Sequence, residues 1–173
     1  ITKEVLKFGG GSSVRFADQL FDVLLHSYRV CDSSVRVFDS LFSTCARLKK
    51  FRFATDVFNR MKEYGFLPNV DSCNAYLSSL LDMNRVDIAF LFYGEMQRCR
   101  ISPNVYTMNM VMSALCKAGR LEKAVELFRD MENVGVGPDV SSYNVLIAGY
   151  CRKGLLSSAI KLKSSMEKNG TVP

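Results

Sequence analysis

Asparagine recurs at a fixed interval in this chain, inside segments where it is an unusual residue. Asn74, Asn109 and Asn144 are separated by 35 residues, and Asp39 stands one interval earlier. Each follows an apolar residue of a helical pattern, where Asn and Asp are unfavourable because their side chains compete for backbone hydrogen bonds. A side-chain amide offers a donor and an acceptor, so such a column could bind the edges of nucleic-acid bases. The alternative is local capping, or a hydrogen bond between neighbouring segments.

Basic residues form a second column. Arg47, Lys117 and Arg152 share one position near the end of the same segments, and Asp82 interrupts the series. A cation at the carboxyl end of a helix is favoured by the helix dipole by about 0.3–1 kcal/mol. The 23 Lys and Arg residues exceed the 17 Asp and Glu residues, giving a net charge of +6. This excess favours an anionic partner without identifying one.

Catalytic, metal and cofactor chemistry have little support in the sequence. His26 is the only histidine, and the six cysteines contain no CxxC pair, so we expect no metal site and no catalytic residues. The glycines of "FGGGSSV" at 8–14 lack the GxGxxG and GK[ST] patterns, and we interpret this stretch as a loop. The chain is therefore not expected to be an enzyme, to hold a cofactor or to take a small-molecule substrate.

Two further features concern the environment of the chain. The longest apolar runs, such as "IAFLFY", are far shorter than the roughly 20 residues that span a bilayer, so no membrane contact is expected. Four cysteines lie within apolar periodic runs, which predicts buried free thiols in a reducing compartment: Cys45, Cys73, Cys116 and Cys151.

The two columns belong to a repeat that covers most of the chain. All four prolines are 35 residues apart, at Pro68, Pro103, Pro138 and Pro173. The same interval separates two apolar columns, Met61, Met96, Met131 and Met166, and Ala54, Ala89, Ala124 and Ala159. This self-similarity predicts repeats at 35–69, 70–104, 105–139 and 140–173, the last of which lacks one residue.

Each repeat is predicted to contain two amphipathic helices. In the third repeat, helical spacing appears twice, first in Met108, Val111, Met112 and Leu115, and then in Ala124, Leu127, Phe128 and Met131. Glycines mark the turn between the helices and the end of the second one, at Gly119, Gly154, Gly135 and Gly170. Such a pair cannot bury both apolar faces alone, so repeats must stack. We expect an all-α fold, an α-α solenoid that forms a right-handed superhelix of helix-turn-helix repeats.

Residues 1–34 do not continue the register. "ADQLFDVLL" repeats the order of a second helix two residues out of step, so we interpret residues 14–30 as a degenerate repeat helix within an N-terminal capping segment. The chain begins with Ile1 and shows no transit segment, and we expect that its natural amino terminus has been removed. We also expect further repeats after Pro173, and self-association through exposed solenoid ends.

Two stretches carry a resemblance to a known family. "YNVLIAGYCRKGLLSSAIKL" and "ALCKAGRLEKAVELFRDMENVGVGPD", together with the 35-residue period, resemble the pentatricopeptide repeat family in its plain P-type class. The tetratricopeptide repeat is the nearest competitor, but it has a period of about 34 residues and an early tryptophan, whereas this chain has no Trp. The resemblance covers residues 35–173. It implies binding of single-stranded RNA, one base per repeat, in RNA processing, stability, splicing or translation in a mitochondrion or chloroplast.

The resemblance also implies roles for individual residues. The fifth residue of a repeat would read a base together with the thirty-fifth, which gives the pairs Asp39 with Asn69, Asn74 with Asn104, and Asn109 with Asp139, plus Asn144, whose partner lies beyond the chain. By the family's correspondence, Asn109 with Asp139 implies uracil and Asn74 with Asn104 implies a pyrimidine. The base for Asp39 with Asn69 stays open. The basic residues Arg47, Lys117 and Arg152 would contact phosphate.

One column departs from the family. The second residue of each repeat is usually aliphatic and sandwiches a base, but this chain has Arg36, Asp71, Tyr106 and Ser141. Tyr106 and Arg36 are the candidates for base stacking. Asp71 would repel phosphate, and Ser141 offers little surface, so base binding is expected to be weak. The alternative function is a protein- or peptide-binding helical scaffold that uses the same groove, which Asp71 and Asp82 favour.

Overall fold

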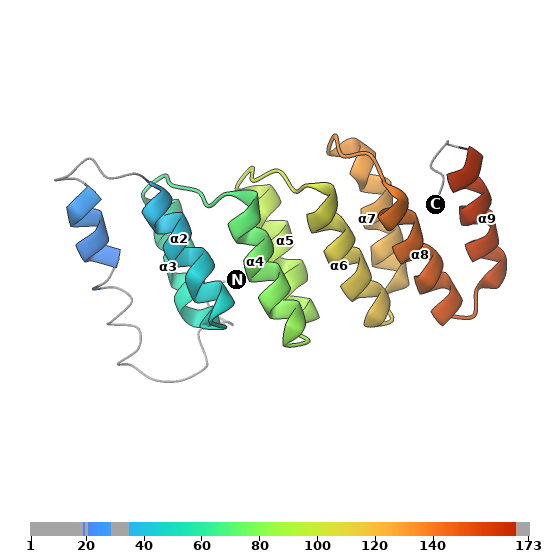
Figure 1. The fold of residues 1–173 in the computed structure, drawn as a ribbon, viewed down its shortest axis with the longest axis horizontal. Helices are drawn as coiled ribbons and strands as arrows, with labels where there is room; N and C mark the ends of the chain where they lie inside the picture. The colour runs from blue at the N-terminus through green and yellow to red at the C-terminus, as the bar shows by residue number, and fades with distance from the viewer. Residues whose placement is uncertain (1–18, 20, 29–34, 169–173) are drawn as a thin grey trace. The chain divides into compact units, whose positions relative to one another are not determined.

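A computed structural model describes residue 19, residues 21–28 and residues 35–168 (Figure 1). These residues form helices joined by short turns and contain no strand, which confirms the all-α class. Residues 21–28 are helical, within the degenerate helix predicted at 14–30. The remainder of that helix, the loop predicted at 8–14, and both Gly170 and Pro173 lie outside the described residues.

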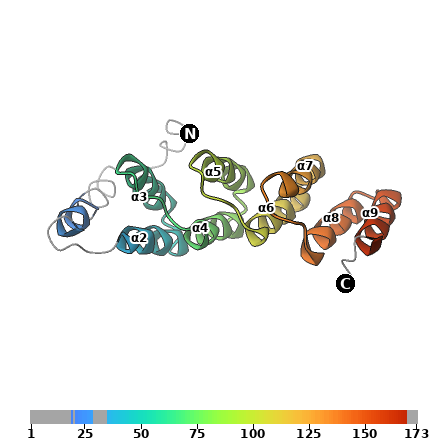
Figure 2. The same ribbon diagram turned by 90° about the horizontal axis from the view of Figure 1, so that it is seen from above.

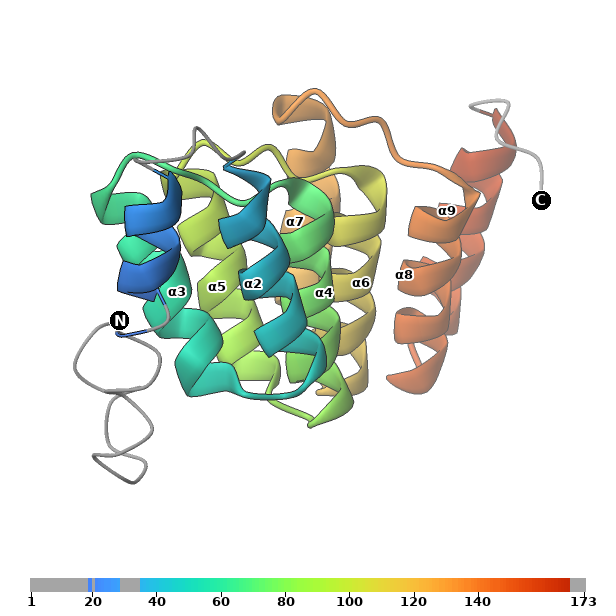
Figure 3. The ribbon, with the colours of Figure 1, turned by 60° about the vertical axis from the view of Figure 1, so that its left-hand side comes forward.

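The chain forms two compact units, the first ending at Ile101 and the second beginning at Ser102. The labelled helices of the first unit are α2 (Arg36–Arg47), α3 (Phe51–Glu63), α4 (Val70–Asp82) and α5 (Val86–Arg98). Helix α2 packs on α3 and α4, and α4 packs on α5. In Figure 2, α2 and α4 form one layer of this unit and α3 and α5 form the other, and Figure 3 shows α2 beside α4.

The second unit repeats the arrangement. Its helices are α6 (Val105–Lys117), α7 (Leu121–Asn133), α8 (Val140–Arg152) and α9 (Leu156–Lys168). Helix α6 packs on α7 and α8, and α8 packs on α9. Helices α4, α6 and α8 begin at equivalent positions 35 residues apart, as do α3, α5, α7 and α9. The predicted solenoid of helix-turn-helix repeats is thereby confirmed, while the repeat boundaries and the superhelix hand stay predictions.

The methionine and alanine columns lie in the core. Met61, Met96 and Met131 are fully buried and Met166 nearly so, and the alanines of the second column are buried as well. In the first unit the layers are joined by aromatic contacts, with the ring of Tyr76 on α4 4.6 Å from that of Phe92 on α5, measured between ring centroids. The recurring apolar residues therefore hold the two layers together.

Three of the four cysteines behave as predicted. Cys45, Cys73 and Cys116 are buried, and burial raises the pKa of each thiol, to about 12 for Cys73. Cys151 is exposed, so its predicted burial is wrong. Cys151 occupies in α8 the position of Cys116 in α6, but Cys116 is covered by Gly149 of α8. No equivalent helix follows α9 among the described residues to cover Cys151.

The turns close with a residue in the left-handed region. Gly119, Gly154 and Gly135 have φ angles of 77°, 73° and 76°, which confirms their predicted positions. Non-glycine residues occupy equivalent positions elsewhere, with φ angles of 57°, 55° and 59° at Lys49, Asn84 and Arg100. The next residue closes each turn by bonding to the carbonyl five positions earlier, as Arg120 N does to Leu115 O at 2.9 Å.

The residue after each internal proline begins the next helix. Asn69, Asn104 and Asp139 are the N-caps of α4, α6 and α8, and their side-chain oxygens accept hydrogen bonds of 2.8–2.9 Å from Ser72 N, Thr107 N and Ser142 N, respectively. The predicted capping is confirmed. Because these N-caps are also the proposed thirty-fifth residues, capping fixes the position of one member of each predicted pair.

Candidate nucleic-acid interface

The first predicted pair is in direct contact in the first unit. Asn69 Nδ2 donates to Asp39 Oδ2 at 2.7 Å, and Asn69 N donates to Asp39 Oδ1 at 2.9 Å. The remaining oxygen of the pair, Asn69 Oδ1, accepts the capping bond from Ser72 N. Every side-chain oxygen of this pair therefore already accepts a hydrogen bond within the protein.

The second unit contains an equivalent contact between Asn109 and Asp139. Asn109 Nδ2 donates to Asp139 Oδ1 at 3.0 Å. Ser142 Oγ lies 2.6 Å from Asn109 Oδ1 and 2.9 Å from Asp139 Oδ1. A hydroxyl has one hydrogen to donate, and the shorter contact is with Asn109. Ser142 therefore bridges both members of the predicted pair and orients the Asn109 amide.

The second-unit pair keeps hydrogen-bonding capacity. Asp139 Oδ1 accepts every hydrogen bond that described residues make with this carboxylate. Asp139 Oδ2 can therefore accept a hydrogen bond from a ligand. Asn109 Nδ2 carries a second hydrogen. Burial by itself would raise the pKa of Asp139. Hydrogen bonds from Asn109 and Ser142 lower the pKa by more than burial raises it, so the pKa falls below its ordinary value. A charged carboxylate oxygen and an amide hydrogen are consequently presented together.

The two pairs have opposite polarity. In the first unit the carboxylate is the fifth residue and the amide is the N-cap, whereas in the second unit the amide is the fifth residue and the carboxylate is the N-cap. The amide donates to the carboxylate in both cases. Equivalent positions thus form the same contact with donor and acceptor exchanged.

The other predicted base readers differ in exposure. Asn74 on α4 is buried and has interactions of its own within the protein. Asn104, its predicted partner, belongs to the second unit, where it caps α6. Asn144 on α8 is exposed. Asn104 is exposed too, but its side-chain oxygen already accepts the capping bond from Thr107 N.

Asn144 lines an open pocket of about 350 Å³ between α6 and α8. The same pocket includes Arg152, a predicted phosphate contact, and Ser141, the second residue of its repeat. Ser113 and Cys116 on α6 complete this part of the wall and were not predicted from the sequence. The second unit thus brings an amide, a guanidinium and a hydroxyl together in one pocket.

The remaining predicted contacts are accessible. The phosphate candidates Arg47, Lys117 and Arg152 are exposed in the last turns of α2, α6 and α8, where the helix dipole also favours cations. Arg36 and Tyr106 are exposed in the first turns of α2 and α6, and Tyr106 retains 61% of its accessible surface. In the first unit, Asp71 and Asp82 are exposed on α4.

Ser142 is the functional candidate that the sequence analysis missed. It recurs with Ser72 and Thr107 at the 35-residue interval, as the third residue of the second, third and fourth predicted repeats. These residues receive the capping bonds, and both Thr107 and Ser142 form capping boxes. The recurrence of hydroxyl-bearing residues at this position is the sequence pattern from which Ser142 could have been predicted. Its bridge to the fifth residue depends on the packing of α6 against α8.

Metal-binding groups and membrane-spanning helices are both absent from the described part of the chain. No group of His, Cys, Asp and Glu side chains there could hold a metal ion. None of the helices described has the length and apolar character needed to cross a membrane.

Family models match most of the chain. The PPR repeat family model matches residues 68–117 and 103–147, the PPR repeat model matches residues 134–167, and the pentatricopeptide repeat domain model matches residues 32–83. These matches cover the helices α2 to α9 almost completely.

Curated relatives include two Arabidopsis thaliana proteins. Pentatricopeptide repeat-containing protein At4g26680, mitochondrial, is 62% identical over 101 residues, which are 58% of this chain and 19% of that protein. Pentatricopeptide repeat-containing protein At2g15630, mitochondrial, is 36% identical over 101 residues, 58% of this chain and 16% of that protein. The chain therefore spans less than a fifth of the length of these relatives.

Solved structures show the same fold. The crystal structure of the pentatricopeptide repeat protein PPR10 from maize matches 91% of this chain and 28% of its own, with a TM-score of 0.67 and 23% identity. The PPR domain of Arabidopsis thaliana protein-only RNase P 1, in complex with tRNA, matches 93% of this chain and 84% of its own, with a TM-score of 0.65 and 17% identity. On the family-model matches, the shared period and the common fold, this chain belongs to the pentatricopeptide repeat family.

Proposed function

We propose that this chain binds single-stranded RNA, with one base held per repeat by the fifth and thirty-fifth residues. The observation that supports this most directly is the contact of Asn109 with Asp139, which presents an amide hydrogen beside a carboxylate oxygen. Uracil has an imino donor flanked by carbonyl acceptors on its Watson–Crick edge. The Asn109–Asp139 pair complements that edge with one acceptor and one donor.

Neighbouring side chains can add affinity in the second unit. Tyr106 exposes a ring on which a base can stack, a contact worth about 1–3 kcal/mol. Lys117 and Arg152 offer exposed cations to phosphate. The net charge of +6 adds long-range attraction for an anionic strand.

Relatives support the nucleic-acid assignment and suggest a location. A solved structure of maize PPR10, similar to this chain at a TM-score of 0.61, contains an 18-nt psaJ RNA element. Two curated relatives bear names that place them in mitochondria. We therefore assign this chain to organelle RNA metabolism, with the mitochondrion as the favoured compartment, and as a binding module rather than a catalyst.

The test is equilibrium binding of short labelled RNAs that differ at one base, across a salt series. Asn109→Ser is expected to change base preference at one RNA position only. Lys117→Ala is expected to weaken all RNAs alike and to reduce the log-log salt slope by about 0.7. Equal effects of the two substitutions on every RNA would show that these roles are wrongly assigned.

A second candidate function is supported by the first unit. Its α4 carries exposed Asp71 and Asp82 and buries Asn74, so this part of the surface is less suited to RNA. A basic peptide along α2 and α4 would complement the carboxylates. Binding of such a peptide, with no RNA binding at low salt, would favour this alternative.

Self-association is a separate proposal. Leu156 and Ile160 lie one helical turn apart on α9 and retain 60% and 66% of their accessible surface. Contact between two such faces would remove apolar area from water. Sedimentation at increasing concentration should show dimers that Ile160→Asp abolishes.

A further inference from the structure

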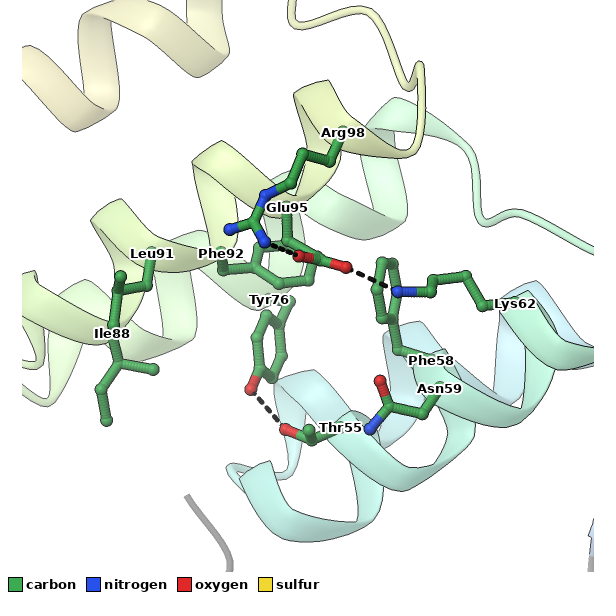
Figure 4. Close-up of a pocket in the computed structure, with 10 residues that line it drawn as sticks. All are labelled: Thr55, Phe58, Asn59, Lys62, Tyr76, Ile88, Leu91, Phe92, Glu95 and Arg98. Atoms are coloured by element: carbon green, nitrogen blue, oxygen red, sulfur yellow. Dashed lines mark hydrogen bonds and ion pairs between the residues drawn. The ribbon is translucent and has the colours of Figure 1, made fainter. Parts of the chain in front are cut away.

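The first unit contains a pocket that the proposed RNA contacts do not use. It has a volume of about 240 Å³ and is lined by α3, α4 and α5 (Figure 4). Its apolar surface includes the rings of Phe58, Tyr76 and Phe92, one from each helix. The Phe58 and Phe92 rings meet edge to face at 5.2 Å, and Tyr76 meets Phe92 edge to face at 4.6 Å. Each such pair adds about 0.5–1.5 kcal/mol to the packing of the aromatic wall.

The polar groups of the pocket are of two kinds. Tyr76 Oη lies 2.9 Å from Thr55 Oγ1, which donates to Phe51 O at 2.8 Å, so the tyrosine hydroxyl donates to the threonine. Asn59, from α3, also lines the pocket, and its side-chain amide makes no hydrogen bond with the other residues drawn in Figure 4. Its amide can donate to and accept from a peptide group.

One end of the pocket carries an excess of positive charge. Lys62 Nζ lies 2.6 Å from Glu95 Oε1, and Arg98 Nη1 lies 3.1 Å from Glu95 Oε2, as the dashed lines in Figure 4 show. Two cations therefore share one carboxylate. The side chains of Lys62 and Arg98 retain 40% and 64% of their accessible surface, against 14% for Glu95. The exposed part of this group is cationic and complements a carboxylate.

The pocket and the proposed base readers use different faces. The α3 and α5 walls belong to the second helices of their repeats, whereas Asp39 and Asn74 lie on the first helices. On α4, Tyr76 follows Asn74 by two residues, which turns its side chain by about 200° around the helix axis. Occupation of the pocket is thus sterically compatible with RNA on the other face.

The opening suits an extended chain better than a nucleobase. Leu91 lines the pocket and retains 50% of its accessible surface, so apolar contact continues from the interior to the outside. The aromatic rings are packed edge to face and are at least nine-tenths buried, so they offer no open ring face for stacking.

We propose that this pocket binds an acidic peptide segment of a partner protein through one bulky apolar side chain. That side chain contacts the accessible edges of Phe58, Tyr76 and Phe92, and Leu91 covers its outer part. A peptide group next to it bonds to the amide of Asn59. A neighbouring Asp or Glu of the peptide faces Arg98 and Lys62.

Selection from a phage-displayed library of random peptides on the immobilised chain tests the proposal. Enriched peptides should combine a bulky apolar residue with an adjacent Asp or Glu. A labelled synthetic copy of an enriched peptide should bind Leu91→Asp about tenfold or more weakly, because a carboxylate replaces apolar contact. Arg98→Glu should weaken it about fivefold.

Matched controls lie on the second unit. Leu155→Asp and Arg129→Glu make the same chemical changes at exposed positions away from the pocket and should leave peptide affinity unchanged. Helix content by circular dichroism checks folding of each variant. No enriched apolar–acidic pattern, or equal affinity for the unchanged chain and Leu91→Asp, would overturn the proposal. The base preference of RNA binding, measured on the same variants, should not change, so the outcome is independent of the proposed RNA function.

Discussion

The side-chain amide of Asn109 donates to the carboxylate of Asp139 at 3.0 Å, although the two residues lie on different helical hairpins. Asp139 also caps α8, so one carboxylate has a structural role and a proposed RNA-binding role. Asp139→Asn keeps a good N-cap residue and should change the free energy of unfolding by less than about 0.5 kcal/mol. It should nevertheless reduce discrimination between uracil and cytosine, because the pair becomes two amides.

Asp139→Ala separates these roles. It removes the cap as well as the acceptor and should lower the free energy of unfolding by about 1 kcal/mol. Chemical denaturation and RNA anisotropy measure the two effects. If Asp139→Asn destabilised the chain as much as Asp139→Ala without affecting base discrimination, Asp139 would be a capping residue alone.

The reversed polarity of Asp39 and Asn69 leads to a second prediction. The double substitution Asp39→Asn with Asn69→Asp leaves the composition and net charge unchanged but gives this pair the polarity of Asn109 with Asp139. It should create a preference for uracil at the corresponding RNA position, by about tenfold, because a bidentate base contact is worth about 1–3 kcal/mol. Binding to RNAs with each base at that position measures the change. An unchanged profile would mean that this pair does not face a base.

Acid sensitivity provides a third prediction. Hydrogen bonds from Asn109 and Ser142 outweigh burial and lower the pKa of Asp139 in the folded chain. A lowered folded pKa contributes stability that is complete above the unfolded pKa of about 3.9 and is lost as pH falls through the folded value. The difference in free energy of unfolding between the unchanged chain and Asp139→Asn should therefore stay constant above about pH 5. Below about pH 4 the unchanged chain should lose stability relative to Asp139→Asn. Thermal melts at several pH values measure it, and a difference independent of pH would contradict the prediction.

Much of the scaffold could be predicted because the same residue types recur at equivalent positions, and this recurrence identifies helices and turns that a single segment would leave ambiguous. The 35-residue interval located the buried methionines, the N-caps and the turns at Gly119 and Gly154. The burial of Asn74 and the bridge from Ser142 could not be located in this way, because both depend on the packing of one helix against another. The pocket beside Tyr76 was missed for the same reason, since three helices contribute to it.

Gly149 marks a close approach between α8 and α6, which are the first helices of their repeats. A Cβ at this position would lie 2.7 Å from Cys116 Sγ and 3.0 Å from Leu121 Cδ1. Gly149→Ala should lower the free energy of unfolding by about 1 kcal/mol, because overpacking outweighs the better helix propensity of alanine. Gly94, which has no atom within 4 Å of a Cβ built on it, is the matched control, and Gly94→Ala should stabilise by up to about 1 kcal/mol.

A second change tests the cause of this effect. Adding Cys116→Ala removes the sulfur nearest to the new methyl group and should recover part of the stability lost in Gly149→Ala. Denaturant unfolding of the single and double variants gives the coupling energy. Additive effects would show that the sulfur is not the obstacle.

The turn at Arg100 holds an L-residue in a conformation that suits glycine, with φ at 59°. The left-handed region costs an ordinary residue about 1–2 kcal/mol, and glycine recovers part of this after the extra entropy of its unfolded state is subtracted. Arg100→Gly should raise the free energy of unfolding by about 0.5–1 kcal/mol. Asn84, with φ at 55°, is the comparison, because asparagine tolerates this region better than arginine does. Asn84→Gly should therefore gain less in the same denaturation experiment, and an equal or larger gain there would mean that backbone strain does not set the stability of these turns.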